Sequence, residues 1–229
     1  MSILPLLSSL YIGAFMKDAG FYIVRSLIKS SPSLRHIRWW EERGLQDLEG
    51  LWTKRIESYS WLCPQQSCHL LHESSSLREL GVFDHPAVAL TLPGLRVLRW
   101  SLSTYSVLHL ITAPHLHTLV LSHERVFTRP LLAGSVTLPN LRVAVHAKIC
   151  EIKNIHGFQT PALEHLSIDT VAQEPKDLSE LFDGSVHMPT PKSLHLKCEF
   201  TDAGLIAVLG GWKSFKSLEP SHRLRFGRD

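Results

Sequence analysis

One short segment of the chain carries the residue types that bind zinc. Cys63 and Cys68 have four residues between them, and His69 and His72 follow directly. Zinc accepts cysteine and histidine ligands, and this cysteine spacing is tolerable. However, His69 adjoins Cys68, and no second ligand pair follows at a usual spacing. We therefore expect no metal site and interpret the cysteines as small, partly buried apolar residues.

The fourteen histidines could in principle supply acid–base chemistry, because histidine titrates near neutral pH. They are scattered along the chain, and no HExxH motif, Ser-His-Asp order or carboxylate pair falls within one frame. The Gly-Ser pairs at 134–135 and 184–185 lack the G-x-S-x-G pattern of a nucleophile elbow. No glycine loop of the phosphate-binding kind is present either. The sequence predicts a protein that is not an enzyme and uses no cofactor.

Composition narrows the class of protein further. The chain has 229 residues, of which 44% are hydrophobic and 20% charged, which is typical of a folded domain. A net charge of +3 without a Lys/Arg-rich run argues against nucleic acid as a partner. Polar residues interrupt every long apolar stretch, so no membrane span is expected.

The cellular compartment is predicted from the cysteines and the first residues. Four cysteines in a chain of this length make no disulfide framework, and no Asn-x-Ser/Thr site occurs. The first 15 residues are apolar, but no basic residue precedes them and Pro5 interrupts them. We expect an intracellular protein, cytoplasmic or nuclear.

A repeating apolar pattern must position any functional residue. Residues 92–100, 113–121 and 160–168 all follow the pattern P-x-L-x-x-L-x-L with apolar residues at relative positions 0, 3 and 5, although position 5 is Trp100 in the first and Ile168 in the third. Seven of the ten copies have proline two residues before position 0, and the copies lie 18 to 28 residues apart. Such a period is the signature of a repeat architecture. Position 0 falls at Leu7, Leu34, Ile56, Leu77, Leu95, Leu116, Leu141, Leu163, Pro191 and Phe215.

Three copies depart from the pattern. The copy at Leu141 continues with valines at 143 and 145, which predicts a shifted or bulged strand. Pro191 occupies a leucine position, and the copy at Phe215 ends in Glu219-Pro220. We therefore expect the repeats to be frayed after about residue 210, as terminal repeats often are.

Each copy combines a strand pattern with a helix pattern. Positions 3 and 5 alternate with period two, as in a strand, and proline fits just before a strand because it cannot donate a ladder hydrogen bond. The stretches between copies show spacings of three and four, which predict short amphipathic helices. These stretches are residues 18–28, 45–51, 178–182 and 202–209.

A unit of one short strand and one short helix cannot bury its own apolar side, so copies must stack. Parallel strands lie about 4.8 Å apart, whereas helices need roughly 10 Å, so the stack should curve with its strands inside. The predicted fold is an α/β solenoid of stacked repeats, with a curved parallel sheet on the concave side and short helices outside. We expect one domain over residues 1–229, with nine or ten irregular repeats.

The frame resembles the leucine-rich-repeat family, and residues 194–205 (LHLKCEFTDAGL) resemble its cysteine-containing subclass. The recurring x-L-P-x-L-R-x-L-x-L is similar to the repeat regions of fungal F-box proteins. The resemblance implies a non-catalytic module that recognises the substrate of a ubiquitin ligase. No F-box is visible, because the repeats begin within ten residues of Met1, so a ligase adaptor would bind only if an F-box existed upstream. The alternative is a stand-alone repeat scaffold or inhibitor with no ligase role.

Function is expected on the inner face, where positions 2, 4 and 6 should point. Exposed aromatic and arginine side chains dominate binding hot spots. A protein partner is expected there, and Trp40 has the alternative of packing against a neighbouring strand or helix. The predicted partner-binding residues are Arg38, Trp40, Phe83, Arg99, His165 and His195.

A second row of side chains lies at position 1 and is basic over four successive copies. Such a stripe could attract an acidic peptide or a phosphate. The alternative, which we favour, is a solvated strand edge that resists misassembly. The four residues are Arg78, Arg96, His117 and Arg142.

Overall fold

The fold is taken from a computed structural model that describes part of the chain. The described residues are 6–12, 18–39, 55–62, 75–83, 89–102, 111–123, 136–149, 158–170, 191–197, 206 and 217–220. They fall into two compact units. Unit 1 comprises Met1–Trp100 and Leu110–His115, and unit 2 comprises Ser101–His109 and Leu116–Asp229.

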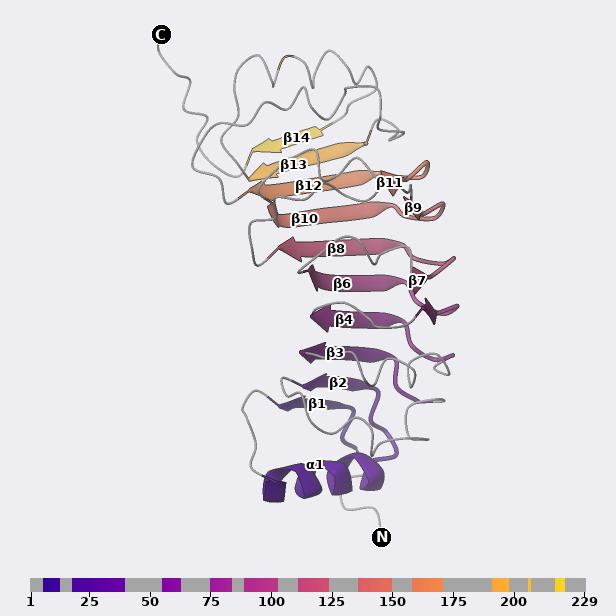
Figure 1. The fold of residues 1–229 in the computed structure, drawn as a ribbon, viewed down its shortest axis with the longest axis vertical. Helices are drawn as coiled ribbons and strands as arrows, with labels where there is room; N and C mark the ends of the chain where they lie inside the picture. The colour runs from indigo at the N-terminus through magenta and orange to yellow at the C-terminus, as the bar shows by residue number, and fades with distance from the viewer. Residues whose placement is uncertain are drawn as a thin grey trace. The chain divides into compact units, whose positions relative to one another are not determined.

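Unit 1 is built on parallel strands that follow one another in chain order, β1-β2-β3-β4-β6 (Figure 1). The unit boundary falls after Trp100, within β6. A parallel neighbour requires the chain to return to the same end of the sheet after each strand, which the long connections allow. The strands are β1 (Ser9–Ile12), β2 (His36–Trp39), β3 (Ser58–Leu62), β4 (Glu79–Phe83) and β6 (Val97–Leu102).

Unit 2 repeats this arrangement with the order β8-β10-β12-β13-β14. The strands are β8 (Thr118–His123), β10 (Val143–Ile149), β12 (His165–Thr170), β13 (Ser193–Lys197) and β14 (Ser217–Pro220). Every strand pair within the two units whose register is described is parallel, so the predicted parallel sheet is confirmed. The ladder also reaches Pro220, beyond the point near 210 where the sequence predicted fraying.

The strands align in the register that the repeat frame predicts. In unit 1, position 3 of each copy pairs with position 3 of the next, as in Leu10↔Ile37 and Tyr59↔Leu80. Unit 2 shows the same alignment, and the copy at Leu141 keeps it through His146, with an irregularity only between His146 and Ile149. The predicted bulge therefore lies at the far end of β10.

The core of each unit consists of the predicted inward positions. Position 0 is buried in every copy from Leu34 to Leu163, and so is the proline that replaces leucine at 191. The first copy differs, because Leu10 on β1 and Leu7, which precedes this strand, are only half-buried. Buried residues at position 3 are Ile37, Tyr59, Leu80, Leu98, Leu119, Ala144, Leu166 and Leu194.

A backbone irregularity explains how positions 0 and 3 both point inward. Side chains alternate between the two faces of a strand. Two inward positions that lie three residues apart therefore require one interruption of this alternation between them, which we call the slip. The slip occurs at positions 1 and 2, where two successive N–H groups donate to one carbonyl of the preceding copy. Glu57 and Ser58 both donate to Arg35 O at 2.8 and 3.1 Å. Arg142 and Val143 likewise donate to His117 O.

The repeated prolines lie at the second position of a tight turn that leads into each strand. The residue at position 0 donates its N–H to the carbonyl three residues earlier, at 3.1 Å from Leu34 to Ser31 and from Leu163 to Thr160. Proline suits this place because its φ is already near the value that the turn requires. The turn-opening residues are buried at Ser31, Leu92, Ala113, Leu138 and Thr160.

Two short parallel ladders lie ahead of these turns and were not expected from the sequence. In unit 1, β5 (Leu90–Thr91) pairs with β7 (Ile111–Thr112). In unit 2, β9 (Val136–Thr137) pairs with β11 (Phe158–Gln159), and Thr137 donates its hydroxyl to Gln159 Oε1 at 3.0 Å. Each copy in these regions therefore contributes two strands.

The first predicted helix is confirmed as α1 (Asp18–Ser30), shown in indigo in Figure 1. Val24 and Ile28, which lie four residues apart, are buried on one side of it. Near its end, the Ser31 hydroxyl donates to Leu27 O at 2.6 Å, and Arg55 Nη2 donates to Ile28 O at 3.1 Å. These contacts satisfy carbonyls that a helix end leaves without partners.

The other predicted helices lie outside the described residues, except that Ile206 is helical. In the described part of the chain, no helix is both long and apolar enough to cross a membrane.

Candidate partner-binding face

The outward strand positions of unit 1 form an exposed face of mixed charge. Positions 2 and 4 alternate with the buried positions 3 and 5, so their side chains lie on the opposite side of the strands from the core. His36, Arg38 and Arg99 are exposed there, as the sequence predicted for the two arginines. Arg38 lies on β2 and Arg99 on β6, so β3 and β4 lie between the two arginines in the sheet.

Arg38 is paired with an aromatic side chain from the neighbouring strand. Its guanidinium carbon lies 5.4 Å from the ring centroid of Tyr11, a distance typical of a cation–π contact. Tyr11 pairs with Arg38 in the register of β1 and β2 and is 63% exposed. Tyr11 was missed at the sequence level, although it stands at position 4 of the copy that begins at Leu7. The repeat pattern alone therefore predicts that the Tyr11 side chain lies on the exposed side of its strand.

Arg99 is held in place by a carboxylate on the adjacent strand. Its Nε lies 2.9 Å from Glu79 Oε1, and Ser58 donates to the other oxygen of Glu79 at 3.5 Å. Both members of the ion pair remain substantially exposed, so the pair adds little stability but fixes the direction of the guanidinium. On the other side of β4, Gly81 pairs with Ser60 of β3. A Cβ at Gly81 would collide with the Ser60 hydroxyl, so β3 and β4 permit only small side chains at this point.

Unit 2 has its own exposed strand face, on which the two predicted histidines lie on adjacent strands. His165 is exposed, and its Nδ1 lies 2.6 Å from Ser193 Oγ. His195 is half-buried and pairs with Ser167 in the register of β12 and β13. Next along the strands, Lys197 Nζ lies 3.4 Å from Asp169 Oδ2. The face alternates histidine, hydroxyl and ion-paired groups.

Two predicted partner-binding residues are not placed. Trp40 lies outside the described residues, and so does the side chain of Phe83, whose backbone ends β4. The alternative packing of Trp40 is likewise outside the described part. The face of unit 1 is therefore defined here by Arg38, Arg99, Tyr11 and Glu79.

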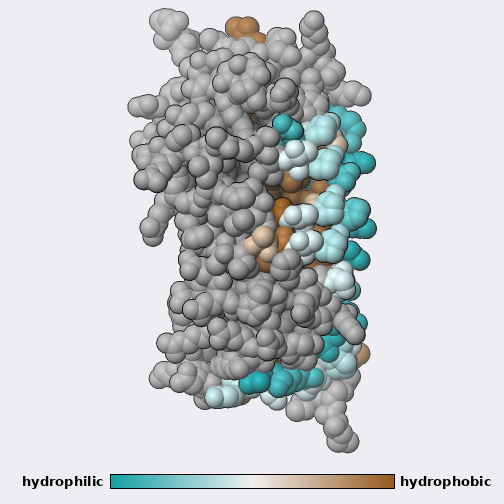
Figure 2. Space-filling model, turned by 45° about the vertical axis from the view of Figure 1, so that its right-hand side comes forward, coloured by the Kyte–Doolittle hydropathy of each residue, from teal (hydrophilic) through white to brown (hydrophobic). Residues whose placement is uncertain are grey.

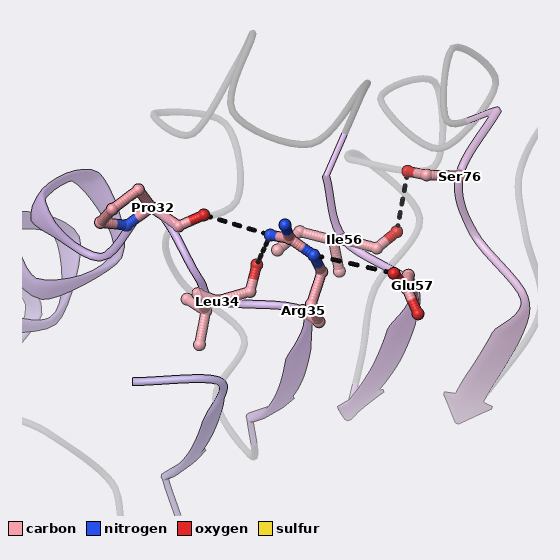
Figure 3. Close-up of polar contacts among 6 residues, drawn as sticks. All are labelled: Pro32, Leu34, Arg35, Ile56, Glu57 and Ser76. Carbon is pink, nitrogen blue, oxygen red and sulfur yellow. Dashed lines mark hydrogen bonds and ion pairs between the residues drawn. The ribbon is translucent and has the colours of Figure 1, made fainter. Parts of the chain in front are cut away.

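Most of the position-1 side chains form hydrogen bonds or ion pairs with other residues of this chain. Arg35 donates to Pro32 O and Leu34 O, both at 3.1 Å, and its Nε lies 3.7 Å from Glu57 Oε1 (Figure 3). A residue outside position 1 acts similarly, because Ser76, which directly precedes Leu77, donates its hydroxyl to Ile56 O at 3.0 Å (Figure 3). These side chains satisfy turn carbonyls that would otherwise depend on water.

The four residues of the predicted basic stripe divide between the units. Arg78 Nη1 donates to Gly94 O at 3.0 Å, while Arg96 is exposed. In unit 2, His117 Nδ1 lies 3.3 Å from the hydroxyl of Thr118, and Arg142 lies 3.5 Å from Glu164. The partners of Arg78 and Arg142 favour the interpretation as a solvated strand edge over an anion site. Figure 2 shows mostly hydrophilic side chains on the described part of one face, beside a smaller hydrophobic area.

Glu164 has the one carboxyl whose titration is clearly altered in the described residues. It accepts a hydrogen bond from Lys192 Nζ at 3.1 Å, and Arg142 Nη1 lies 3.5 Å from the same carboxylate oxygen. The hydrogen bond from Lys192 lowers the pKa of Glu164 most, and the positive charges of Lys192, Arg142 and His165 lower it further. The carboxylate therefore stays charged to lower pH than an ordinary glutamate.

No group of three or more potential metal ligands occurs among the described residues. Cys63, Cys68, His69 and His72 lie outside them.

Comparisons with protein families, with curated proteins and with solved structures found no match to this chain. The resemblance to leucine-rich repeats therefore has only the repeat pattern and the geometry above as support.

Proposed function

We propose that this chain is a leucine-rich-repeat solenoid that binds a protein partner through its exposed strand face and catalyses no reaction. The observation that carries the proposal is the pair Arg38 and Tyr11, which is exposed yet anchored on neighbouring strands. Arginine and tyrosine are the residue types in which binding energy concentrates. Side chains held on strands lose little conformational freedom on binding.

The repeat architecture is supported by the common register of each unit. Copies 18 to 28 residues apart place the same relative positions in the core, and the same two N–H groups donate to the same carbonyl in each unit. On this proposal, the helices predicted at 45–51, 178–182 and 202–209 lie on the outer side of the stack.

The partner class is inferred from the resemblance to fungal F-box proteins. We propose that the module resembles the substrate-recognition region of an F-box receptor in a ubiquitin ligase, with an intracellular protein as its substrate. The alternative, a stand-alone scaffold or inhibitor, uses the same face without a ligase. Two observations distinguish them: whether an F-box is encoded in frame upstream, and whether a ubiquitin-ligase adaptor co-purifies with that product.

The binding face is tested with charge reversal. An interaction screen with the intact chain identifies partners, and Arg38→Glu combined with Arg99→Glu should abolish binding of a partner that uses this face. The matched control is Arg96→Glu combined with Lys192→Glu, which changes the net charge equally at two exposed position-1 residues. Both variants should keep the circular dichroism of the parent chain. Full binding by the first variant would exclude this face.

A further inference from the structure

The first strand of unit 1 is less completely covered than the strands that follow it. β1 stands at the end of the strand order, and among the described residues it pairs only with β2 (Figure 1). β2 and β3 have a neighbour on each side, and their position-3 residues are almost fully buried, with Ile37 2% and Tyr59 0% exposed. Leu10 holds the same position on β1 and is only half-buried. The first copy therefore presents apolar surface that a further strand would cover.

The backbone of β1 also presents hydrogen-bonding groups on the side away from β2. The N–H of His36 donates to Ser8 O at 3.0 Å, and His36 is the register partner of Ser9. The backbone groups of successive residues alternate between the two edges of a strand, so every second residue of β1 bonds to β2. The N–H and C=O groups of Ser9 and Tyr11 consequently point to the outer edge. Such a row is a template for pairing with another strand.

β1 lacks the features by which proteins protect an exposed strand edge. Charged residues and proline are the usual protection, and the sequence of β1, Ser-Leu-Tyr-Ile, contains neither. β14, at the other end of the strand order, ends in Glu219-Pro220. A head-to-tail assembly, in which β1 of one copy joins β14 of the next, is therefore disfavoured. An identical, uncharged β1 is the better complement.

We propose that two copies of this chain associate through their β1 strands, antiparallel about a two-fold axis. Closed two-fold pairing is the commonest arrangement of identical subunits. In the register that pairs both outward residues of each strand, Ser9 of one copy exchanges hydrogen bonds with Tyr11 of the other. Leu10 then lies opposite Leu10 of the other copy, where side chains approach most closely. The proposal does not depend on the proposed function, because it uses the edge of the sheet and not its exposed face.

The test is sedimentation velocity of the full chain over a range of concentrations. The paired strands are short, so we expect a weak dimer with a dissociation constant on the order of 10–100 µM. Ser9→Pro removes an N–H that points to the outer edge, and the two-fold axis removes that hydrogen bond twice, so association should weaken about tenfold or more. Ser9→Ala keeps the N–H, is the matched control and should dimerise like the parent. Proline is tolerated at the first residue of an edge strand, so both variants should keep the circular dichroism of the parent.

A second measurement traps the pairing covalently. Leu10→Cys should form a disulfide between two copies under mild oxidation, because the Cα atoms of such an opposed pair lie about 4.5 Å apart, within the range of a disulfide. The controls are Arg96→Cys, at an exposed residue away from β1, and the parent chain with its four native cysteines.

Three results would overturn the proposal. A parent chain that stays monomeric up to about 500 µM would leave the edge of β1 to a strand of a different protein. Equal dimerisation of Ser9→Pro and Ser9→Ala would mean that another surface joins the copies. Cross-linking of Leu10→Cys no faster than that of Arg96→Cys would mean that the two Leu10 residues do not meet.

Discussion

At the scale of single residues, Glu164 offers a direct measurement of the charge network on unit 2. Its pKa is lowered mainly by the hydrogen bond from Lys192, so Lys192→Met should raise that pKa toward the value of an ordinary glutamate. Because the folded pKa is lowered, the stabilising contribution of Glu164 is present above the unfolded pKa. It is lost as the pH falls through the folded pKa.

The measurement is an NMR pH titration of the Glu164 carboxyl. Lys197→Met serves as the control, because Lys197 pairs with Asp169 and is not among the groups that lower the pKa of Glu164. An unchanged pKa in Lys192→Met would mean that the 3.1 Å contact is not made in solution.

Gly94 is a turn residue at which a single added carbon should destabilise the fold. A Cβ there would lie 2.9 Å from Ser75 O and 3.1 Å from Leu77 O, and both are backbone atoms. Gly94→Ala should therefore destabilise the fold by about 1–3 kcal/mol, because the backbone must shift. Urea unfolding measures the change.

The control for Gly94 comes from the same place in another turn. Ala162 follows Pro161 as Gly94 follows Pro93, so the same turn position carries a Cβ in another copy. Ala162→Gly should change the free energy of unfolding by less than about 1 kcal/mol. An equally small effect of Gly94→Ala would mean that the close approach of Ser75 is absent.

Contacts between individual side chains on neighbouring strands were the hardest feature to predict from the sequence. The frame placed Arg38 and Arg99 on the exposed side correctly, because the alternation of a strand fixes the side of each residue. It could not show that Arg99 pairs with Glu79, since this depends on which strand lies next to which and on side-chain rotamers. Tyr11 was missed although the frame reaches it.

At the scale of the element, β8 tests whether inward and outward positions differ as proposed. Leu119 is 1% exposed, and its neighbour Val120 is half-buried on the opposite side of the strand. Leu119→Ala should cost about 2–5 kcal/mol, because it removes buried methyl groups and leaves a cavity. Val120→Ala removes fewer atoms from a less buried site and should cost about 1 kcal/mol or less.

Chemical denaturation followed by circular dichroism gives both values for β8. Equal effects of the two substitutions would show that the strand is not packed on one side only, and the repeat frame would then be wrong in unit 2.

Elements were predictable where one period was repeated many times. The strands and α1 follow from spacings of two and of three to four residues, which local packing enforces. The ladders β5–β7 and β9–β11 were missed because each strand has two residues, too few to show a period. A signal was present in Val136-Thr137-Leu138-Pro139, where an apolar residue alternates with threonine before the proline.

At the scale of the whole molecule, the same backbone device recurs in both units. A frame with inward positions at 0 and 3 requires a slip between them, and the structure places it at positions 1 and 2 each time. Sequence could not predict how the slip is stabilised, because the shared carbonyl belongs to the preceding copy. Each copy is thus stabilised through its contacts with the copy before it, as expected when one copy cannot bury its own apolar side.

Hydrogen exchange tests this shared device across the molecule. The amides at positions 1 and 2 donate to a carbonyl of the preceding copy, so they should exchange slowly wherever the frame recurs. Glu57 and Ser58 in unit 1 should therefore be protected to a similar degree as Arg142 and Val143 in unit 2. Ala162 is the internal reference, because its amide donates no hydrogen bond within the described residues, and it should exchange rapidly. Rapid exchange of the paired amides in either unit would mean that its strands are not joined by the repeat frame.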